Sequence, residues 1–282
     1  MYPNAFEYHR ATSVEEAVGM LAADPEAKIL AGGHSLIPAM KLRLAMPGML
    51  VDLGQIESLR GITVNGGATI GAMTTYRELL DSEELAQAFP IIRTTAKVVG
   101  DPAVRNRGTL GGALAHSDPA ADYTAVMLAL GASVTVVGTN GERTIGADDL
   151  FVDLFTTSLE PEEILTTITI PSADGAGMAY HKHAHPASGY AVVGVAAVLK
   201  VENGTCSSAR IAVTGATTIA TRATAAEQAL TGKPVDAQTI AAAAALASQG
   251  LELNGDVYAS AEYRANLIRV LAKRAITEAA GR

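Results

Sequence analysis

The sequence has only one cysteine, Cys206, and no tryptophan among its 282 residues. A single cysteine excludes a disulfide within the chain, and it excludes an iron–sulfur cluster held by thiolates of this chain alone. No stretch approaches the roughly 18 consecutive apolar residues of a membrane-spanning helix, so we predict no membrane insertion. The first residues have neither the basic segment nor the apolar stretch of a secretory signal, and we therefore expect a cytoplasmic protein.

Basic residues are in the minority, because 21 Lys and Arg stand against 29 Asp and Glu, for a net charge of −8. This balance does not favour binding to nucleic acid, which needs a basic surface. Several catalytic signatures are missing as well: the P-loop pattern, the G-x-G-x-x-G fingerprint, the nucleophile elbow and an isolated pair of acidic residues. We therefore assign no catalytic residue to this chain.

Two glycine-rich segments are the clearest positive signal. They span Ala31 to Ser35 and Thr109 to Ala113. Each segment lies where an apolar stretch gives way to an expected helix, so each can turn backbone N–H groups toward an anion. Two such loops in one chain indicate a diphosphate ligand, although each loop taken alone is equally consistent with a tight turn.

Helix caps are expected directly after both loops. Ser35 is predicted to cap a helix over residues 36–42, and Asp118 to cap a helix that begins at Pro119 and ends before Gly131. Asp122 lies one turn into that second helix and has no structural role that the sequence reveals. Its carboxylate could accept a hydrogen bond from a ligand hydroxyl.

The order of the predicted elements indicates an α+β fold in two domains. A hairpin around Asn65-Gly66-Gly67 is placed in a first lobe, and a second lobe is expected to start near Pro90. A breaker-rich stretch at residues 172–177 marks the boundary. We predict domains at 1–175, split into two α+β subdomains near 58–90, and at 176–282, with three strands followed by helices.

Three alternating histidines, His181, His183 and His185, share one face of a predicted strand. A metal site there is conceivable, but no acidic or cysteine ligand accompanies them and Pro186 indicates a turn, so we assign no metal. Cys206 has no neighbouring histidine and is interpreted as a packing residue.

With these motifs in place, the chain resembles the FAD-binding medium subunit of the molybdenum hydroxylases, the group of aerobic carbon monoxide dehydrogenase and bacterial xanthine dehydrogenase. The similarity covers nearly the whole length. The segments that carry it are residues 6–11, 30–38, 70–75, 107–112, 117–122, 161–165 and 261–264.

The resemblance implies a flavin-binding domain of the vanillyl-alcohol-oxidase type with two α+β subdomains, followed by a smaller C-terminal flavoprotein domain. It implies that FAD relays electrons from [2Fe-2S] clusters of a small partner subunit to an external acceptor. The molybdenum cofactor would belong to a large partner subunit, in a dimer of heterotrimers. NAD, a quinone and oxygen all stay open as acceptors.

Site residues follow from the same resemblance. Asp122 should hold a ribityl or ribose hydroxyl, Leu165 should pack on the adenine or the flavin, and Lys182 should place its ammonium near the flavin pyrimidine or the diphosphate. Tyr190 should lie near the isoalloxazine ring, with a role in sheet packing as the alternative. The remaining implied cofactor contacts lie in or beside the two loops: Ala31, Gly32, Gly33, His34, Ser35, Thr109, Leu110, Gly111, Gly112, Ala113, Ser117 and Asp118.

Two other functions are weighed against this one. A self-sufficient flavoenzyme of the same fold would need a proton donor beside the flavin, and the sequence reveals none. A binding protein that has lost its flavin is disfavoured by the intact glycine loops.

Overall fold

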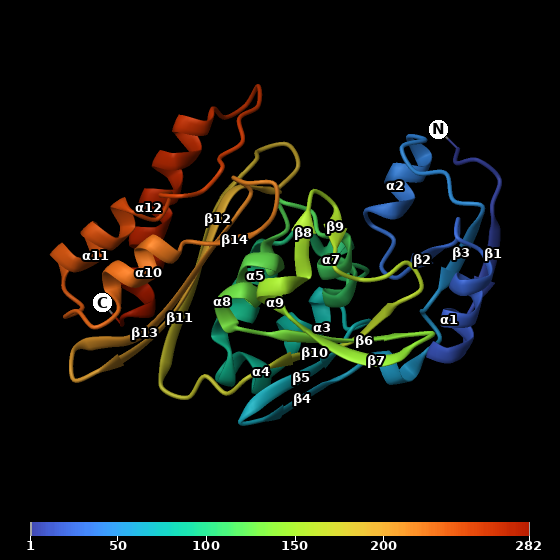
Figure 1. The fold of residues 1–282 in the computed structure, drawn as a ribbon, viewed down its shortest axis with the longest axis horizontal. Helices are drawn as coiled ribbons and strands as arrows, with labels where there is room; N and C mark the ends of the chain where they lie inside the picture. Colours follow the sequence, from blue (N-terminus) through green and yellow to red (C-terminus); the bar gives the residue numbers. More distant parts are fainter. Residues whose placement is uncertain (1, 282) are drawn as a thin grey trace.

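Three sheets of three or more strands, each packed against helices, follow one another along the chain in the computed structural model, which describes residues 2–281 (Figure 1). The first sheet is parallel, in the order β1-β3-β2. Helix α1 begins after Ser13, whose side chain accepts the N–H of Glu16, and it buries Ala17, Val18 and Leu21. The elements of this first lobe are β1 (Glu7–Arg10), α1 (Val14–Ala23), β2 (Lys28–Leu30), α2 (Leu36–Lys41), β3 (Met49–Asp52) and the 3-10 turn η1 (Glu57–Leu59).

The second sheet is antiparallel, in the order β4-β5-β10-β6-β7. Ile168 in the central strand lies opposite both Ile70 and Val134, and all three side chains are buried. The strands are β4 (Ile62–Asn65), β5 (Gly67–Gly71), β6 (Ser133–Gly138), β7 (Gly141–Gly146) and β10 (Ile164–Ile170), and a small hairpin comprises β8 (Phe151–Asp153) and β9 (Thr156–Thr157).

Helices of the second lobe cover this sheet and lead into the cleft described below. Thr75 and Glu78 form the capping box that the sequence predicts at the start of α3. Helix α8 is buried at every position, which is typical of a helix packed on all sides. The helices are α3 (Tyr76–Asp81), α4 (Glu83–Ala88), α5 (Pro90–Val98), α6 (Pro102–Arg105), α7 (Leu110–His116), α8 (Asp122–Leu130) and α9 (Ala147–Leu150).

The third sheet is antiparallel, in the order β11-β12-β13-β14, and is covered on both faces. Alternate residues of its central strand point to opposite sides. Val193 and Val195 pack with α10 to α12, whereas Ala196 packs into the core around α8. Figure 1 shows the sheet between these two groups of helices. The elements are β11 (Ala176–Ala184), β12 (Ala191–Glu202), β13 (Thr205–Thr214), β14 (Thr221–Arg222), α10 (Thr224–Leu230), α11 (Ala237–Ala245) and α12 (Ala261–Ala279).

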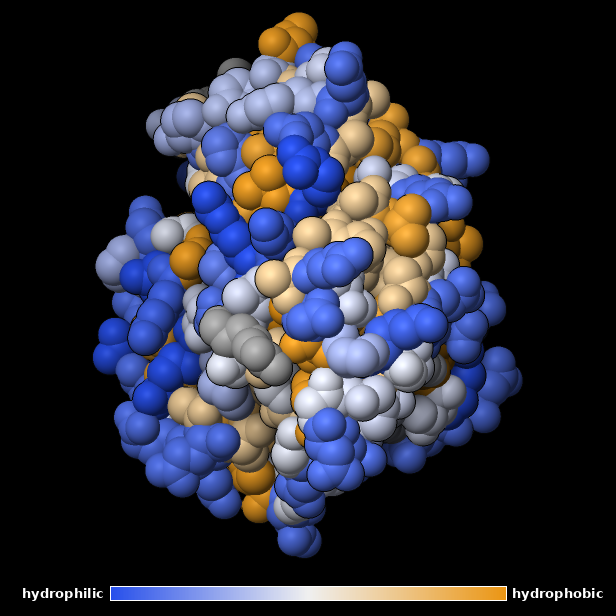
Figure 2. All heavy atoms as spheres, turned by 90° about the vertical axis from the view of Figure 1, so that its left-hand side faces the viewer, coloured by the Kyte–Doolittle hydropathy of each residue, from blue (hydrophilic) through white to orange (hydrophobic). Residues whose placement is uncertain are grey.

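The outer face of the C-terminal helices mixes hydrophilic side chains with small apolar patches (Figure 2). No helix within residues 2–281 is long and apolar enough to cross a membrane. Cys206 is fully buried, and its thiol contacts the carbonyl of Ser208.

The structure confirms most predicted elements and corrects three. The hairpin at residues 62–71 pairs with β10 and so belongs to the second sheet, not to the first lobe. The C-terminal sheet has a fourth, two-residue strand, β14, which is too short to give a sequence pattern. The helix expected from Pro119 begins at Asp122, because the Asp118 carboxylate accepts the N–H of Ala120 and closes a turn there.

Candidate functional site

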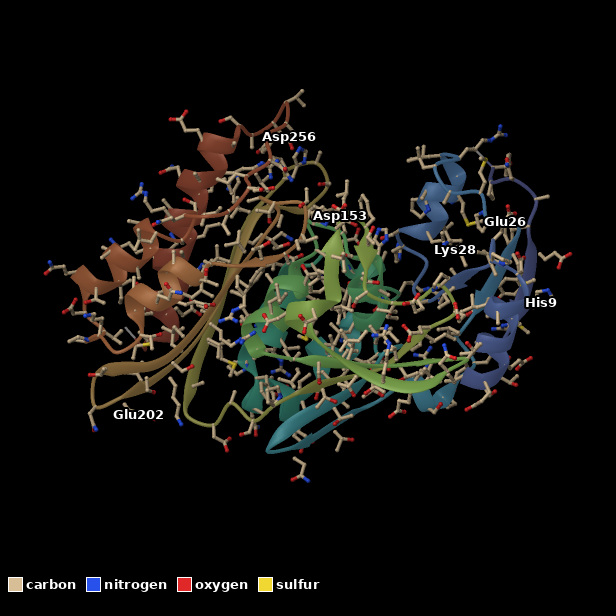
Figure 3. The ribbon with its side chains drawn as sticks, in the orientation of Figure 1. His9, Glu26, Lys28, Asp153, Glu202 and Asp256 are labelled. Carbon is tan, nitrogen blue, oxygen red and sulfur yellow. The ribbon has the colours of Figure 1, made fainter. Side chains whose placement is uncertain are left out.

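A cleft of about 610 Å³ lies between the first and second lobes, and the loop between β11 and β12 closes part of its rim. In Figure 3, Lys28 of β2 and Asp153 at the β8–β9 hairpin mark the two sides of this region. Both glycine loops line the cleft. A volume of this size is typical of a site for a small-molecule cofactor.

Gly32 of the first glycine loop packs against the backbone that leads directly into the second loop. A Cβ atom added to Gly32 would lie 2.3 Å from the carbonyl oxygen of Arg107 and 2.9 Å from the Cα of Gly108. Gly33 adopts a φ of +76°, a backbone conformation that favours glycine. Glycine is therefore required at both positions, once for close approach and once for backbone conformation.

The first loop presents unused donors. Within residues 2–281, the N–H groups of Gly32, Gly33, His34 and Ser35 donate to no protein acceptor. The imidazole of His34 lies 3.2 Å from the carbonyl of Ala103 and ties the loop to α6. Ser35 precedes α2 but its side chain makes no capping bond, which corrects the predicted cap. Consecutive free N–H groups of this kind form an anion-binding concavity.

The second loop is different, because it is the first turn of α7. Thr109 caps this helix through Gly112, and the N–H groups of Leu110, Gly111 and Ala113 donate to Thr74, Ala72 and Thr109 carbonyls at 2.9 to 3.1 Å. The structure therefore corrects the expectation that this loop offers a row of free N–H donors. Thr109, Gly112 and Ala113 still line the cleft, and a Cβ on Gly112 would lie 3.5 Å from that of Ala31.

Five predicted contact residues lie outside the cleft lining, namely Lys182, which is described below, and four other residues. Leu110 is fully buried, and a Cβ added to Gly111 would lie 2.5 Å from that of Ala72. Ser117 is buried and ends α7 in the left-handed region, with a φ of +50°. Leu165 is buried in β10 within the core of the second lobe. These residues support the walls of the cleft rather than form its surface.

Asp122 has a structural role that its sequence position did not reveal. Asp122 is one of the cleft residues, and its carboxylate receives the hydroxyl of Tyr180 at 2.6 Å and the ammonium of Lys182 at 2.9 Å. Burial raises the pKa of Asp122, and the Lys182 charge and the Tyr180 hydrogen bond oppose that rise. Lys182 itself is not among the cleft residues, and its ammonium lies between the Asp122 carboxylate and the carbonyl of Val98.

Tyrosines line the interior wall and the rim of the cleft. Tyr76 and Tyr123 stack with ring centroids 5.3 Å apart, and burial raises the pKa of both phenols. Tyr190 lies at the rim, between β11 and β12, with about 44% of its surface exposed. Burial of its phenol and the nearby charge of Asp118 raise the pKa of Tyr190.

Phe155 is a cleft residue that sequence reasoning missed. It lies at the tip of the β8–β9 hairpin with a φ of +53°, and its ring centroid is 5.1 Å from that of His116. A bulky residue in the left-handed region is uncommon and marks a constrained position. Nothing in the local sequence signals this arrangement, because His116 is on a different element.

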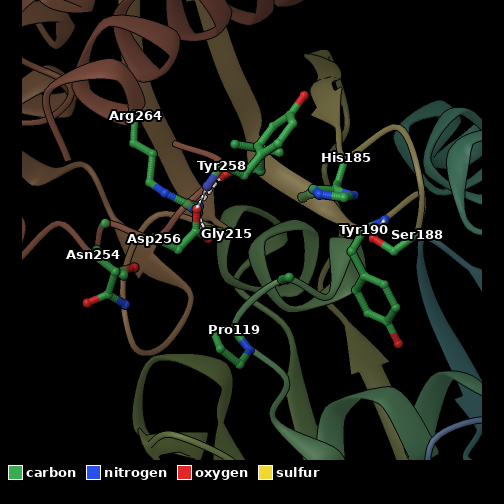
Figure 4. Close-up of a pocket in the computed structure, with 14 residues that line it drawn as sticks. Pro119, His185, Ser188, Tyr190, Gly215, Asn254, Asp256, Tyr258 and Arg264 are labelled. Carbon is green, nitrogen blue, oxygen red and sulfur yellow. Dashed lines mark hydrogen bonds and ion pairs between the residues drawn. The ribbon is translucent and has the colours of Figure 1, made fainter. Parts of the chain in front are cut away.

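A second, smaller hollow of about 340 Å³ adjoins the cleft, and Ser188 and Tyr190 line both (Figure 4). Its back wall is Arg264, whose guanidinium is buried and pairs with Asp256. The same guanidinium donates to the carbonyls of Val192 and Gly215, so it fastens α12 to β12 and to the segment after β13.

The three alternating histidines face the C-terminal segment separately. His181 lies 2.8 Å from Glu278, His183 meets Tyr263 edge-on, and the His185 ring centroid is 4.4 Å from that of Tyr258. Within residues 2–281, no three His, Cys, Asp or Glu side chains are grouped to hold a metal ion.

Comparisons with known proteins agree with this architecture. Residues 4–173 match the family model described as the FAD binding domain in molybdopterin dehydrogenase, and residues 178–279 match the CO dehydrogenase flavoprotein C-terminal domain. The carbon monoxide dehydrogenase medium chain of Hydrogenophaga pseudoflava is 39% identical over 99% of this chain and 98% of its own.

Solved structures give the same result. Carbon monoxide dehydrogenase from Hydrogenophaga pseudoflava has a chain with a TM-score of 0.96 and 41% identity, covering 99% of this chain and 98% of that one. Quinoline 2-oxidoreductase from Pseudomonas putida 86 has one with a TM-score of 0.94 and 36% identity, covering 100% and 99%. The predicted fold, a flavin-binding domain followed by a C-terminal domain, is therefore confirmed. The chain belongs to the FAD-binding medium subunits of the molybdenum hydroxylases, and it is an oxidoreductase subunit whose cofactor is FAD.

Proposed function

We propose that this chain is the electron-transfer subunit of a heterotrimeric molybdenum hydroxylase. It takes electrons from [2Fe-2S] clusters of a small partner subunit and passes them to an external acceptor. The observation that carries the proposal is the cleft with its row of four free N–H groups at Gly32 to Ser35, held in place by the contact between the two glycine loops. The single cysteine is buried, so the clusters must be supplied by another chain.

The cleft residues fit FAD in a defined way. The N–H groups of the first loop would bind the diphosphate, and the closely packed glycines leave room for it to approach the backbone. Thr109, Gly112 and Ala113 would form the facing wall, and the Asp122 carboxylate would accept a sugar or polyol hydroxyl. When bound, FAD supplies the carrier that links the partner's clusters to the acceptor.

The rim of the cleft is where we place the flavin ring. Tyr190 and Phe155 are both half-exposed and both line the cleft, so their rings would flank a planar group and limit its contact with water. The proposal requires no side chain at this rim to transfer a proton. The work of the chain is to bind the cofactor, fix its position and leave one edge open.

We also propose the wider organisation of the enzyme. The substrate would be oxidised at a molybdenum cofactor on a large subunit, and the three subunits would form a dimer of heterotrimers in the cytoplasm. Relatives named for carbon monoxide and for quinoline have the same fold as this chain, which supports placing substrate choice on another subunit. Within the chain, we propose 1–175 as the FAD-binding domain and 176–282 as the C-terminal domain.

The test is to produce the chain together with its large and small partners and to analyse the purified complex. We expect flavin absorbance, FAD by mass spectrometry at one per medium chain, and reduction of that flavin by substrate only when the [2Fe-2S] subunit is present. A complex without FAD would refute the proposal. Turnover by the chain alone, without partners, would instead establish the self-sufficient flavoenzyme.

A further inference from the structure

Lys182 joins the C-terminal sheet to two helices of the second lobe that lie at the cleft. It belongs to β11, and its side chain is only 3% exposed. Its ammonium donates to the Asp122 carboxylate at 2.9 Å and to the carbonyl of Val98 at 3.1 Å. Asp122 is the first residue of α8 and Val98 the last of α5, and the two residues after Val98 line the cleft. One buried cation therefore fixes two cleft elements that are separate in sequence.

Tyr180 holds the same carboxylate from the same strand. Its hydroxyl donates to Oδ1 of Asp122 at 2.6 Å. A Cβ added to Gly194 on the neighbouring strand would lie 2.2 Å from this hydroxyl, so glycine at 194 leaves the space that the phenol needs. The position of the hydroxyl is therefore determined by the packing of two strands.

The Asp122 carboxylate has capacity left after these two contacts. A carboxylate can accept about four hydrogen bonds, and within residues 2–281 Tyr180 and Lys182 are the side chains that donate to it. Asp122 is itself among the cleft residues, whereas Lys182 and Tyr180 are not. The backbone N–H of Asp122 also contributes a hydrogen bond, and the capacity that remains is open to a group bound in the cleft.

Building on the proposed function, we propose that Lys182 and Tyr180 are positioning residues of the FAD site. They hold the Asp122 carboxylate charged and oriented so that it accepts a hydroxyl of the cofactor, and neither of them touches the cofactor. This role differs from a direct contact between the Lys182 ammonium and the flavin. It also makes cofactor binding depend on a strand of the C-terminal sheet that contributes no side chain to this wall.

The pairing of the Lys182 and Asp122 charges allows the positioning role of Lys182 to be distinguished from a role in packing alone. Removing the ammonium leaves a buried carboxylate without its partner, which is far more damaging than removing both charges together. Asparagine at position 122 keeps an oxygen acceptor of the same shape but needs no cation. The double change should therefore restore what the single change removes.

The experiment uses the assembled complex, stripped of flavin and titrated with FAD. We expect Lys182→Met to raise the FAD dissociation constant about 10- to 100-fold, the range for losing a hydrogen bond to a charged group. Adding Asp122→Asn to Lys182→Met should recover most of the affinity. Tyr180→Phe should weaken binding by about 3- to 10-fold. Lys200→Met is the matched control, because Lys200 is half-exposed on β12 and pairs only with exposed Glu202.

Thermal unfolding of the FAD-free complex is measured on every variant, so that loss of fold is not counted as loss of binding. If Lys182→Met lowers only the unfolding temperature and leaves the dissociation constant unchanged, the positioning role is wrong. It is equally wrong if the double variant binds no better than Lys182→Met. A wild-type complex that binds no FAD would instead refute the proposed function itself, which keeps the two failures distinct.

Discussion

Replacing Gly32 with alanine tests the contact that sets the spacing of the two glycine loops. The added methyl group would lie 2.3 Å from the carbonyl oxygen of Arg107, whereas Cβ atoms do not approach other heavy atoms more closely than 3.0 Å. The neighbour is backbone, so it cannot rotate away as a flexible side chain could. The loops must therefore separate by about 0.7 Å, which displaces the row of N–H groups from its present position.

The cost of such overpacking is about 1 to 3 kcal/mol. If the loops relax apart in the FAD-free protein, the cost appears mainly as lost affinity, because the cofactor must then bind to displaced donors. At about 1.4 kcal/mol per factor of ten, the FAD dissociation constant should rise by roughly 5- to 150-fold. The backbone N–H groups at Gly33, His34 and Ser35 are unchanged chemically, so some binding should persist.

The assay is FAD titration of the flavin-free complex, followed by quenching of flavin fluorescence, with thermal unfolding measured in parallel. Gly19→Ala is the matched control, since Gly19 lies within α1 and an added Cβ meets nothing within 4 Å. That change should stabilise the helix by about 1 kcal/mol and leave FAD affinity unaltered. If Gly32→Ala binds FAD as tightly as the wild type, the spacing of the two loops does not control the site and the reasoning fails.

Three further predictions concern the walls of the site and the C-terminal part. Glu163 accepts two hydrogen bonds from Arg143, and these lower the pKa of its carboxyl below the ordinary 4.5. The pair therefore stabilises the fold above pH 4.5, and this stabilisation is lost as the pH falls through the lowered pKa. Arg143→Met should make the free energy of unfolding less sensitive to acid between about pH 5 and 3, and an unchanged pH profile would contradict this. Arg222→Met should lower the free energy of unfolding by about 2 to 4 kcal/mol in denaturant titrations, because the buried Glu227 carboxylate would lose its charged partner and keep only the N–H of Ile211; a loss under about 0.5 kcal/mol would show that solvent replaces the guanidinium. Phe155→Gly should leave the unfolding temperature nearly unchanged, since relief of the backbone strain at the left-handed φ of residue 155 offsets the lost contact with His116. FAD should nevertheless dissociate faster from this variant in stopped-flow displacement. Equal dissociation rates for the variant and the wild type would place the Phe155 ring outside the flavin site.

Local features of the fold were predictable from sequence because their causes lie within a few residues. The capping box at Thr75 and Glu78 is one case. The turn at Asn65 and Gly66 and the helix end at Gly131 are others, and the structure confirms all three. In each case the side chain or the backbone conformation of the named residue is sufficient to produce the turn or the cap.

The sequence could not predict how distant elements share their polar groups. The ammonium of Lys182 and the carboxylate of Asp122 are 60 residues apart, so no spacing rule links them. The N–H groups of the second loop are used by Ala72 and Thr74, which a glycine motif cannot reveal. The glycine-rich sequence pattern therefore identified both loops, and only the packed structure showed that the first loop is the one with unused backbone N–H donors.

Helix α8 has a consequence for how the chain can be divided. Its nine residues are all buried, because it packs against α5, α7 and α9 of its own lobe and against β12, β13 and β14 of the C-terminal sheet. A fragment that stopped at residue 175 would expose one side of this apolar helix to solvent, and the fragment should therefore aggregate. The C-terminal part therefore covers an apolar flank of its neighbour in the folded chain.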